Sequence, residues 1–101
     1  VYGEVTQVVV DLRKDSSTYL KWQSYKINKA DQKMVLIPPG CGNAYYVGSQ
    51  HAVYHYKLAY DGGYIDAVEQ FSVRWDDPSI AIDWPVTEPH LSARDMEAPF
   101  I

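Results

Sequence analysis

Hydrophobic and polar residues alternate over short stretches of this chain, a pattern that predicts β-strands. The β-branched run Val5–Leu12 is typical of a largely buried strand, and residues 18–28 alternate with the strand period of two. Further short strands are expected at residues 34–37, 43–47, 52–58 and 71–75. These roughly six strands, with turn signals between them, predict an all-β antiparallel sandwich or barrel.

Helical signals are confined to the C-terminal region. Ser92-Ala93-Arg94-Asp95 has the spacing of a capping box with the shorter acid, which predicts one helical turn. Residues 76–89 contain prolines at positions 78, 85 and 89, and we expect an ordered tail that lies over the barrel.

Length and charge narrow the classes of protein to consider. The chain has 101 residues, which fits one domain, and its net charge of −4 argues against binding to nucleic acid or to an anionic membrane surface. No apolar run is long enough to cross a membrane. The single cysteine, Cys41, cannot close an intrachain disulfide, so a reducing, cytoplasmic setting is expected. Because the chain opens at Val1 near a predicted strand, we expect it to be part of a longer polypeptide.

The histidines and the cysteine give no signature of a metal site or of a nucleophile. His51 and His55 are four residues apart, a spacing that suits one face of a helix, whereas this segment alternates as a strand. Cys41 lies between two glycines in a loop, and no neighbouring base is evident that would form the thiolate. We therefore predict neither a metal nor another cofactor.

The predicted strand at residues 52–58 carries the most informative side chains. Alternation places Tyr54 and Tyr56 on one face, and a buried phenol needs a hydrogen-bond partner. A positioned phenol can act as a general acid toward a developing enolate, and the alternative is an aromatic core with satisfied hydroxyl groups. From spacing alone, Arg94 and Asp95 are best interpreted as surface residues.

Several sequence blocks, taken in order, resemble the C-terminal part of the dTDP-4-dehydrorhamnose 3,5-epimerase family. The resemblance covers essentially the whole chain. The blocks are Gly3-Glu4-Val5, Val10-Asp11-Leu12-Arg13, Ser16-Ser17-Thr18, Ile37-Pro38-Pro39-Gly40, Tyr56-Lys57, Trp75-Asp76-Asp77-Pro78, Ile82-Asp83-Trp84-Pro85 and Leu91-Ser92-Ala93-Arg94-Asp95. This resemblance implies a cupin, a jelly-roll β-barrel that is typically dimeric and needs no metal. It also implies epimerisation at C3 and C5 of a nucleotide-linked 4-keto-6-deoxy sugar, and a single cupin domain at residues 1–101 that lacks its N-terminal strands.

The resemblance also implies roles for individual residues. Tyr56 matches the family's proton donor, and Asp95 matches the carboxylate that supports a histidine base, which is expected upstream of Val1. Arg94 falls where a cationic residue contacts the nucleotide diphosphate. The remaining substrate-binding candidates depart from the family pattern or are ambiguous in alignment. They are Asn43 in place of a histidine, Gln70 near a usual glutamate, and Tyr60 or Tyr64 as the residue that stacks on the nucleobase.

The nucleotide and the reaction stay open at this point. The blocks Gly42-Asn43-Ala44, Ala52-Val53-Tyr54, Ala59-Tyr60 and Gln70-Phe71 resemble a branch that acts on GDP-linked 4-keto-6-deoxyheptoses, which leaves thymidine or guanosine as the nucleoside. One alternative to an epimerase is a non-catalytic cupin that binds a nucleotide sugar or a glycan, because a fold alone does not confer activity. Another is a 3,4-ketoisomerase. In each case the expected partner is a nucleotide-diphosphate sugar.

Overall fold

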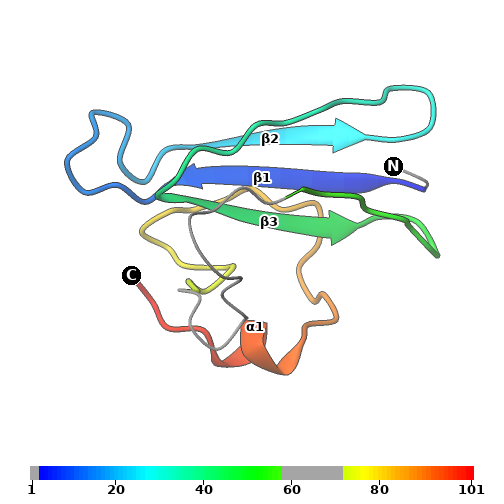
Figure 1. Ribbon diagram of the computed structural model, residues 1–101. Helices are drawn as coiled ribbons and strands as arrows, with labels where there is room; N and C mark the ends of the chain where they lie inside the picture. Colours follow the sequence, from blue (N-terminus) through cyan, green and yellow to red (C-terminus); the bar gives the residue numbers. More distant parts are fainter. Residues whose placement is uncertain (1–2, 58–71) are drawn as a thin grey trace.

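An antiparallel sheet of three strands organises the part of the chain that the computed structural model describes, residues 3–57 and 72–101 (Figure 1). The strands are β1 (Val5–Asp11), β2 (Trp22–Ile27) and β3 (Cys41–Val47), and β1 lies between the other two. They correspond to three of the segments in which strands were predicted. The sequence pattern thus located the centre of the sheet.

The central strand is buried because both of its faces are covered. Val8 and Val10 are buried on one face, and Val5 is buried on the other, directly opposite Ile27 of β2. Alternation along a strand sends successive side chains to opposite faces, so a run of β-branched residues fits a strand that is covered on both sides. The run Val8-Val9-Val10 therefore accounts for the position of β1 in the middle of the sheet.

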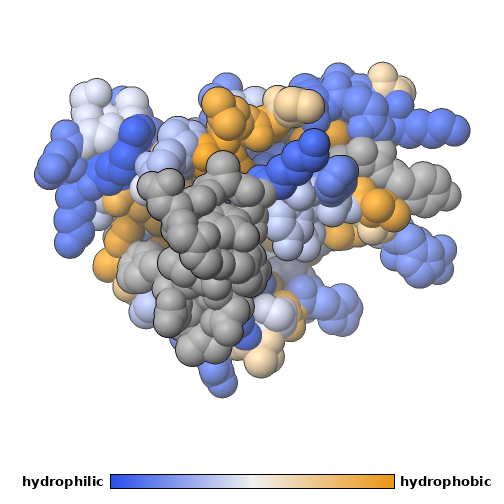
Figure 2. Space-filling model, viewed as in Figure 1, coloured by the Kyte–Doolittle hydropathy of each residue, from blue (hydrophilic) through white to orange (hydrophobic). Residues whose placement is uncertain are grey.

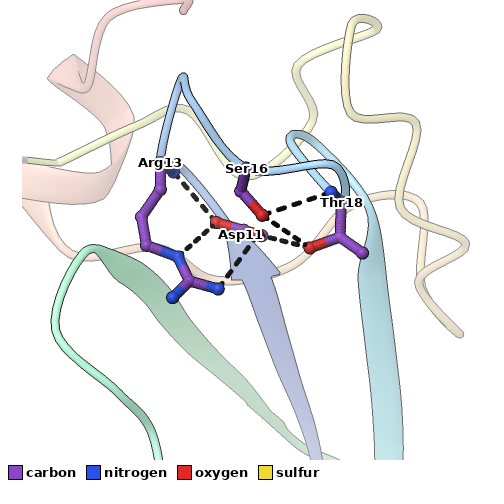
Figure 3. Close-up of polar contacts among 4 residues, drawn as sticks. All are labelled: Asp11, Arg13, Ser16 and Thr18. Atoms are coloured by element: carbon purple, nitrogen blue, oxygen red, sulfur yellow. Dashed lines mark hydrogen bonds and ion pairs between the residues drawn. The ribbon is translucent and has the colours of Figure 1, made fainter.

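The connection from β1 to β2 is anchored by the buried carboxylate of Asp11, at the end of β1 (Figure 3). Asp11 accepts hydrogen bonds from the backbone N and the Nε of Arg13, at 3.0 and 2.9 Å, and from the hydroxyl of Thr18. The Arg13 guanidinium is the main reason why the pKa of Asp11 lies well below its usual range, and the hydroxyl groups of Ser16 and Thr18 lower it further. The Asp11 side chain thereby connects Arg13, at the start of this loop, with Thr18 in its second half.

The C-terminal region forms the predicted helical turn, α1 (Ala93–Glu97). Ser92 is its N-cap, and the Ser92 Oγ accepts a hydrogen bond from the backbone N of Asp95 at 3.2 Å, which is half of the predicted capping box. The buried Asp77 accepts from the backbone N of Ser79 and of Ile101, so the end of the chain is tied back to the tail. These hydrogen bonds hold the start of the tail at Asp77, and its position over a barrel stays a prediction.

Three predicted strands are absent from the described residues. The segments 34–37, 52–57 and 72–75 form no regular strand, and only Val53 makes an isolated bridge. Met34 and Leu36 are 99% and 92% exposed, and the backbone N of Arg74 donates to the carbonyl of Pro99, beyond α1, and not to a strand. An alternating pattern makes a segment suitable for a sheet, but a strand forms only where a neighbouring strand supplies hydrogen bonds.

The structure confirms the predicted fold class but not the predicted closure of the barrel. The all-β character is confirmed, because the described residues form an antiparallel sheet and one short helix. Closure into a jelly-roll barrel stays a prediction, because the described strands form a single three-stranded sheet. Within residues 3–57 and 72–101, no helix has the length and apolar character that spanning a membrane requires.

Candidate active site

One face of the sheet carries polar and aromatic side chains next to its centre. The strand register places Gln7 of β1 directly between Tyr25 of β2 and Tyr45 of β3, and Asn43 lies two residues before Tyr45 on the same face. We call the set Gln7, Tyr25, Asn43 and Tyr45 the polar face. These are hydrogen-bonding and stacking groups, the kinds that recognise a small polar ligand.

A hydrogen bond between two carboxamides lies at the centre of the polar face. Gln7 is only 3% exposed, and its Nε2 donates to the Oδ1 of Asn43 at 2.8 Å. Asn43 itself is exposed. Burial of a polar side chain is costly unless it is hydrogen-bonded, so this contact accounts for a buried glutamine in a strand rich in valine. No buried side-chain nitrogen or oxygen of the described residues lacks a partner.

Three tyrosine rings lie in sequence, beginning in β3 and leading away from it. We call Tyr45, Tyr54 and Tyr56 the tyrosine row. The rings of Tyr45 and Tyr54 are stacked, with centroids 4.5 Å apart and an interplanar angle of 22°. The ring of Tyr56 lies 6.2 Å from that of Tyr54. Tyr56 is 64% exposed, so its phenol is open to solvent or a ligand and does not belong to an enclosed aromatic core.

The structure brings some of the predicted site residues together and leaves others apart. Asn43 and Tyr56 are linked through the polar face and the tyrosine row. Arg94 and Asp95 lie exposed on α1, and the side chain of neither forms an ion pair or a hydrogen bond with another described residue. The candidates Tyr60, Tyr64 and Gln70 lie outside the described residues.

Asn43 and Tyr56 are exposed to solvent and lie outside the hollow at the end of β1. A hollow of about 300 Å³ lies near the end of β1, lined by Asp11, Arg13, Lys21 and Tyr25 among others, but its lining includes neither Asn43 nor Tyr56. The hydropathy-coloured surface in Figure 2 shows a mixture of polar and apolar side chains over the described residues of the face in view. Among residues 3–57 and 72–101, no three His, Cys, Asp or Glu side chains gather closely enough to hold a metal ion.

Three members of this site, Gln7, Tyr25 and Tyr45, were not singled out from the sequence. Gln7 was included in a strand expected to be largely buried, although a glutamine within a run of valines is itself a signal for a specific polar contact. Tyr45 has no local signal, because its importance comes from a stack with a residue nine positions later in the chain.

An antiparallel β-sheet with a hydrogen-bonding and aromatic face defines the class of protein as a β-sheet domain. Comparison with known proteins makes the assignment specific. The sequence profile of the dTDP-4-dehydrorhamnose 3,5-epimerases matches residues 1–101, and the chain therefore belongs to this family.

Individual relatives agree with this assignment. The chain is 33% identical over 100 residues to dTDP-4-dehydrorhamnose 3,5-epimerase of Salmonella typhimurium, an alignment covering 98% of this chain and 53% of the relative. It is 36% identical over 98 residues to dTDP-4-dehydrorhamnose 3-epimerase of Streptomyces niveus, covering 97% of this chain and 46% of that protein. The chain thus spans about half the length of the curated relatives it matches.

Solved structures show the same likeness in three dimensions. The dTDP-6-deoxy-D-glucose-3,5-epimerase of Legionella pneumophila, determined in complex with dTDP-4-keto-L-rhamnose, superimposes with a TM-score of 0.76 at 30% identity. The match covers 98% of this chain and 52% of that structure. The fold of the chain is thus similar to part of an epimerase of known structure.

Proposed function

We propose that the intact protein containing this chain epimerises a nucleotide-linked 4-keto-6-deoxy sugar in deoxysugar or polysaccharide biosynthesis. The observation that carries the proposal is the exposed phenol of Tyr56, which lies on the side of the sheet where Asn43 presents a carboxamide. Membership of the epimerase family supports the reaction class. The nucleoside is thymidine or guanosine, and inversion takes place at C3, C5 or both.

The chemistry requires an acid and a base on opposite faces of the sugar ring. The 4-keto group acidifies the hydrogens on C3 and C5, so a base removes one of these protons and an enolate forms. Tyr56 then donates the phenolic proton to the same carbon from the other face, and the configuration inverts. Hydrogen-bond donors near the enolate oxygen stabilise the charge that develops there. No metal is needed for these proton transfers.

The other predicted site residues have roles in supporting the base and in binding the substrate. A histidine upstream of Val1 supplies the base, and Asp95 supports it. The exposed carboxylate of Asp95, which has no ion-pair partner among the described residues, supports this role. Arg94 contacts the diphosphate, Asn43 contacts the sugar, and Gln70 together with Tyr60 or Tyr64 contacts the nucleotide sugar.

The architecture that we propose for the intact protein is a closed jelly roll. Residues 1–101 form one cupin domain whose N-terminal strands lie upstream, and two copies associate. The exposed apolar side chains of Met34 and Leu36, on a segment whose backbone is unpaired among the described residues, support association with a second copy. A cytoplasmic setting fits a chain whose single cysteine cannot form an intrachain disulfide.

Replacement of Tyr56 by phenylalanine tests this function. In deuterium oxide, the intact protein should incorporate deuterium at C3 or C5 of a 4-keto-6-deoxy nucleotide sugar, as detected by mass spectrometry or NMR. Tyr56→Phe removes the acidic proton and keeps the ring, so turnover should fall by about 10² to 10⁴-fold, equivalent to about 3 to 5 kcal/mol in activation free energy.

Tyr46→Phe is the matched control for this substitution. Tyr46 lies on the opposite face of β3, opposite Thr6 of β1, so loss of its hydroxyl should leave the exchange rate close to that of the unsubstituted protein. Unchanged inversion at C3 or C5 in Tyr56→Phe, followed by NMR, would remove Tyr56 from its role as the acid, because the base alone can return a deuteron only to the face from which it took the proton. If the unsubstituted protein binds the nucleotide sugar and exchanges no deuterium, a non-catalytic binding protein becomes the better interpretation.

A further inference from the structure

The hydrogen bond between Gln7 and Asn43 fixes which end of the Asn43 carboxamide faces outward. Its consequence for catalysis rests on the function proposed above. Gln7 is buried, and its Nε2 donates to the Oδ1 of Asn43 at 2.8 Å. A carboxamide has an acceptor oxygen and a donor NH2 group on separate branches. Since the oxygen of Asn43 is engaged by Gln7, the Nδ2 is the group that stays available.

The available Nδ2 group lies on the side where the tyrosine row begins. Asn43 and Tyr45 are two residues apart on β3 and so share a face, and the stack of Tyr45 on Tyr54 continues toward Tyr56. Within the described part of the chain, no residue accepts a hydrogen bond from the Asn43 Nδ2. An exposed side-chain donor, held by the hydrogen bond from Gln7, therefore lies on the same face as the tyrosine row that leads to the proposed acid.

We propose that Gln7 is a positioning residue that fixes the Asn43 carboxamide so that its Nδ2 donates a hydrogen bond to an oxygen of the bound sugar, the keto or enolate oxygen. The buried glutamine determines which end of Asn43 points outward. Without the Gln7 donor, the exposed carboxamide is free to rotate and to present its oxygen, which would repel a developing enolate. Both groups are neutral amides, so this donor is available at every pH at which the protein is folded.

Gln7→Glu is the direct test because the change keeps the shape of the side chain and reverses its hydrogen bonding. An ionised carboxylate only accepts, so the Asn43 carboxamide turns and its oxygen faces outward. We expect deuterium exchange into the 4-keto sugar at neutral pH to fall by about 100-fold, the effect of losing one donor to an oxyanion. Gln50→Glu, an exposed site beyond β3, adds the same charge and should retain the original rate.

The pH profile distinguishes positioning from a general loss of structure. Burial raises the pKa of the introduced carboxyl group, and its protonated form can again donate to Asn43. The rate of Gln7→Glu relative to the unsubstituted protein should therefore rise as the pH falls. The titratable groups nearest on this face are Tyr25 and Tyr45, with Asp11 four residues farther along β1, and all three are present in both proteins being compared.

A second variant, Asn43→Asp, changes the exposed partner of the same hydrogen bond and introduces no buried charge. Asn43→Asp still accepts from Gln7 but has no N–H group, so it should also lose about 100-fold in exchange while its circular dichroism spectrum is unchanged. Full activity in Asn43→Asp overturns the inference. This result is decisive even if Gln7→Glu does not fold. A folded Gln7→Glu protein with an undiminished rate overturns it as well. Both results presuppose an active unsubstituted protein, and absence of exchange there overturns the proposed function itself.

Discussion

The stack between Tyr45 and Tyr54 makes a prediction that connects the stability of the sheet with the rate of the proposed reaction. Tyr45 is held in a hydrogen-bonded strand, whereas Tyr54 lies in a segment without regular strand structure. The stack on Tyr45, at a centroid distance of 4.5 Å, therefore connects the ring of Tyr54 to the ordered sheet. Because Tyr56 is only two residues farther along the chain, loosening Tyr54 should also loosen the proposed acid.

The size of the effect follows from the energy of the stack. A stacked aromatic pair contributes about 0.5 to 1.5 kcal/mol beyond its buried area. If Tyr45→Leu removes this preference, the equilibrium constant for alignment of Tyr54 falls by about 2- to 12-fold, since 1.4 kcal/mol corresponds to a factor of ten. Epimerisation at saturating substrate should fall by no more than this factor. This loss is far smaller than that expected for Tyr56→Phe.

A double-mutant cycle measures the stack itself. Tyr45→Leu, Tyr54→Leu and the double variant are compared in urea unfolding, and the coupling energy should be about 1 kcal/mol. Tyr45→Phe keeps the ring and serves as the control, with little change in either stability or exchange. Strict additivity of the two leucine substitutions would refute the reasoning. So would a hundredfold loss of exchange in Tyr45→Leu, because that loss would mean that Tyr45 takes part in the chemistry directly.

Two further predictions concern acid stability and assembly. Because the Arg13 guanidinium, with the hydroxyls of Ser16 and Thr18, lowers the pKa of folded Asp11, its contribution to stability is complete above the unfolded value of about 4 and is lost as the pH falls below it. Asp11→Asn should therefore be less stable at neutral pH and less sensitive to acid in thermal unfolding, and an unchanged dependence on pH would contradict this. Leu36→Lys should weaken self-association in sedimentation velocity, because it places a charge on the exposed apolar segment, and a monomeric unsubstituted protein would contradict the proposed dimer.

The sequence by itself determined the elements whose signals are local. The run of valines in β1 favours a buried strand through side-chain shape alone, and Ser92 begins a helix because its hydroxyl accepts from a backbone N–H three residues later. The order of the family's sequence blocks also identified the family, which the comparison confirmed.

Only the tertiary structure decided which patterned segments became strands and which side chains met. Residues 34–37 have the composition of a strand, yet Met34 and Leu36 are exposed, because a strand requires a neighbour that local sequence does not specify. Gln7 and Asn43 are 36 residues apart, and their hydrogen bond depends on the register between β1 and β3. Contacts of this kind form only when distant segments are brought together, so the orientation of the candidate site is a property of the folded chain.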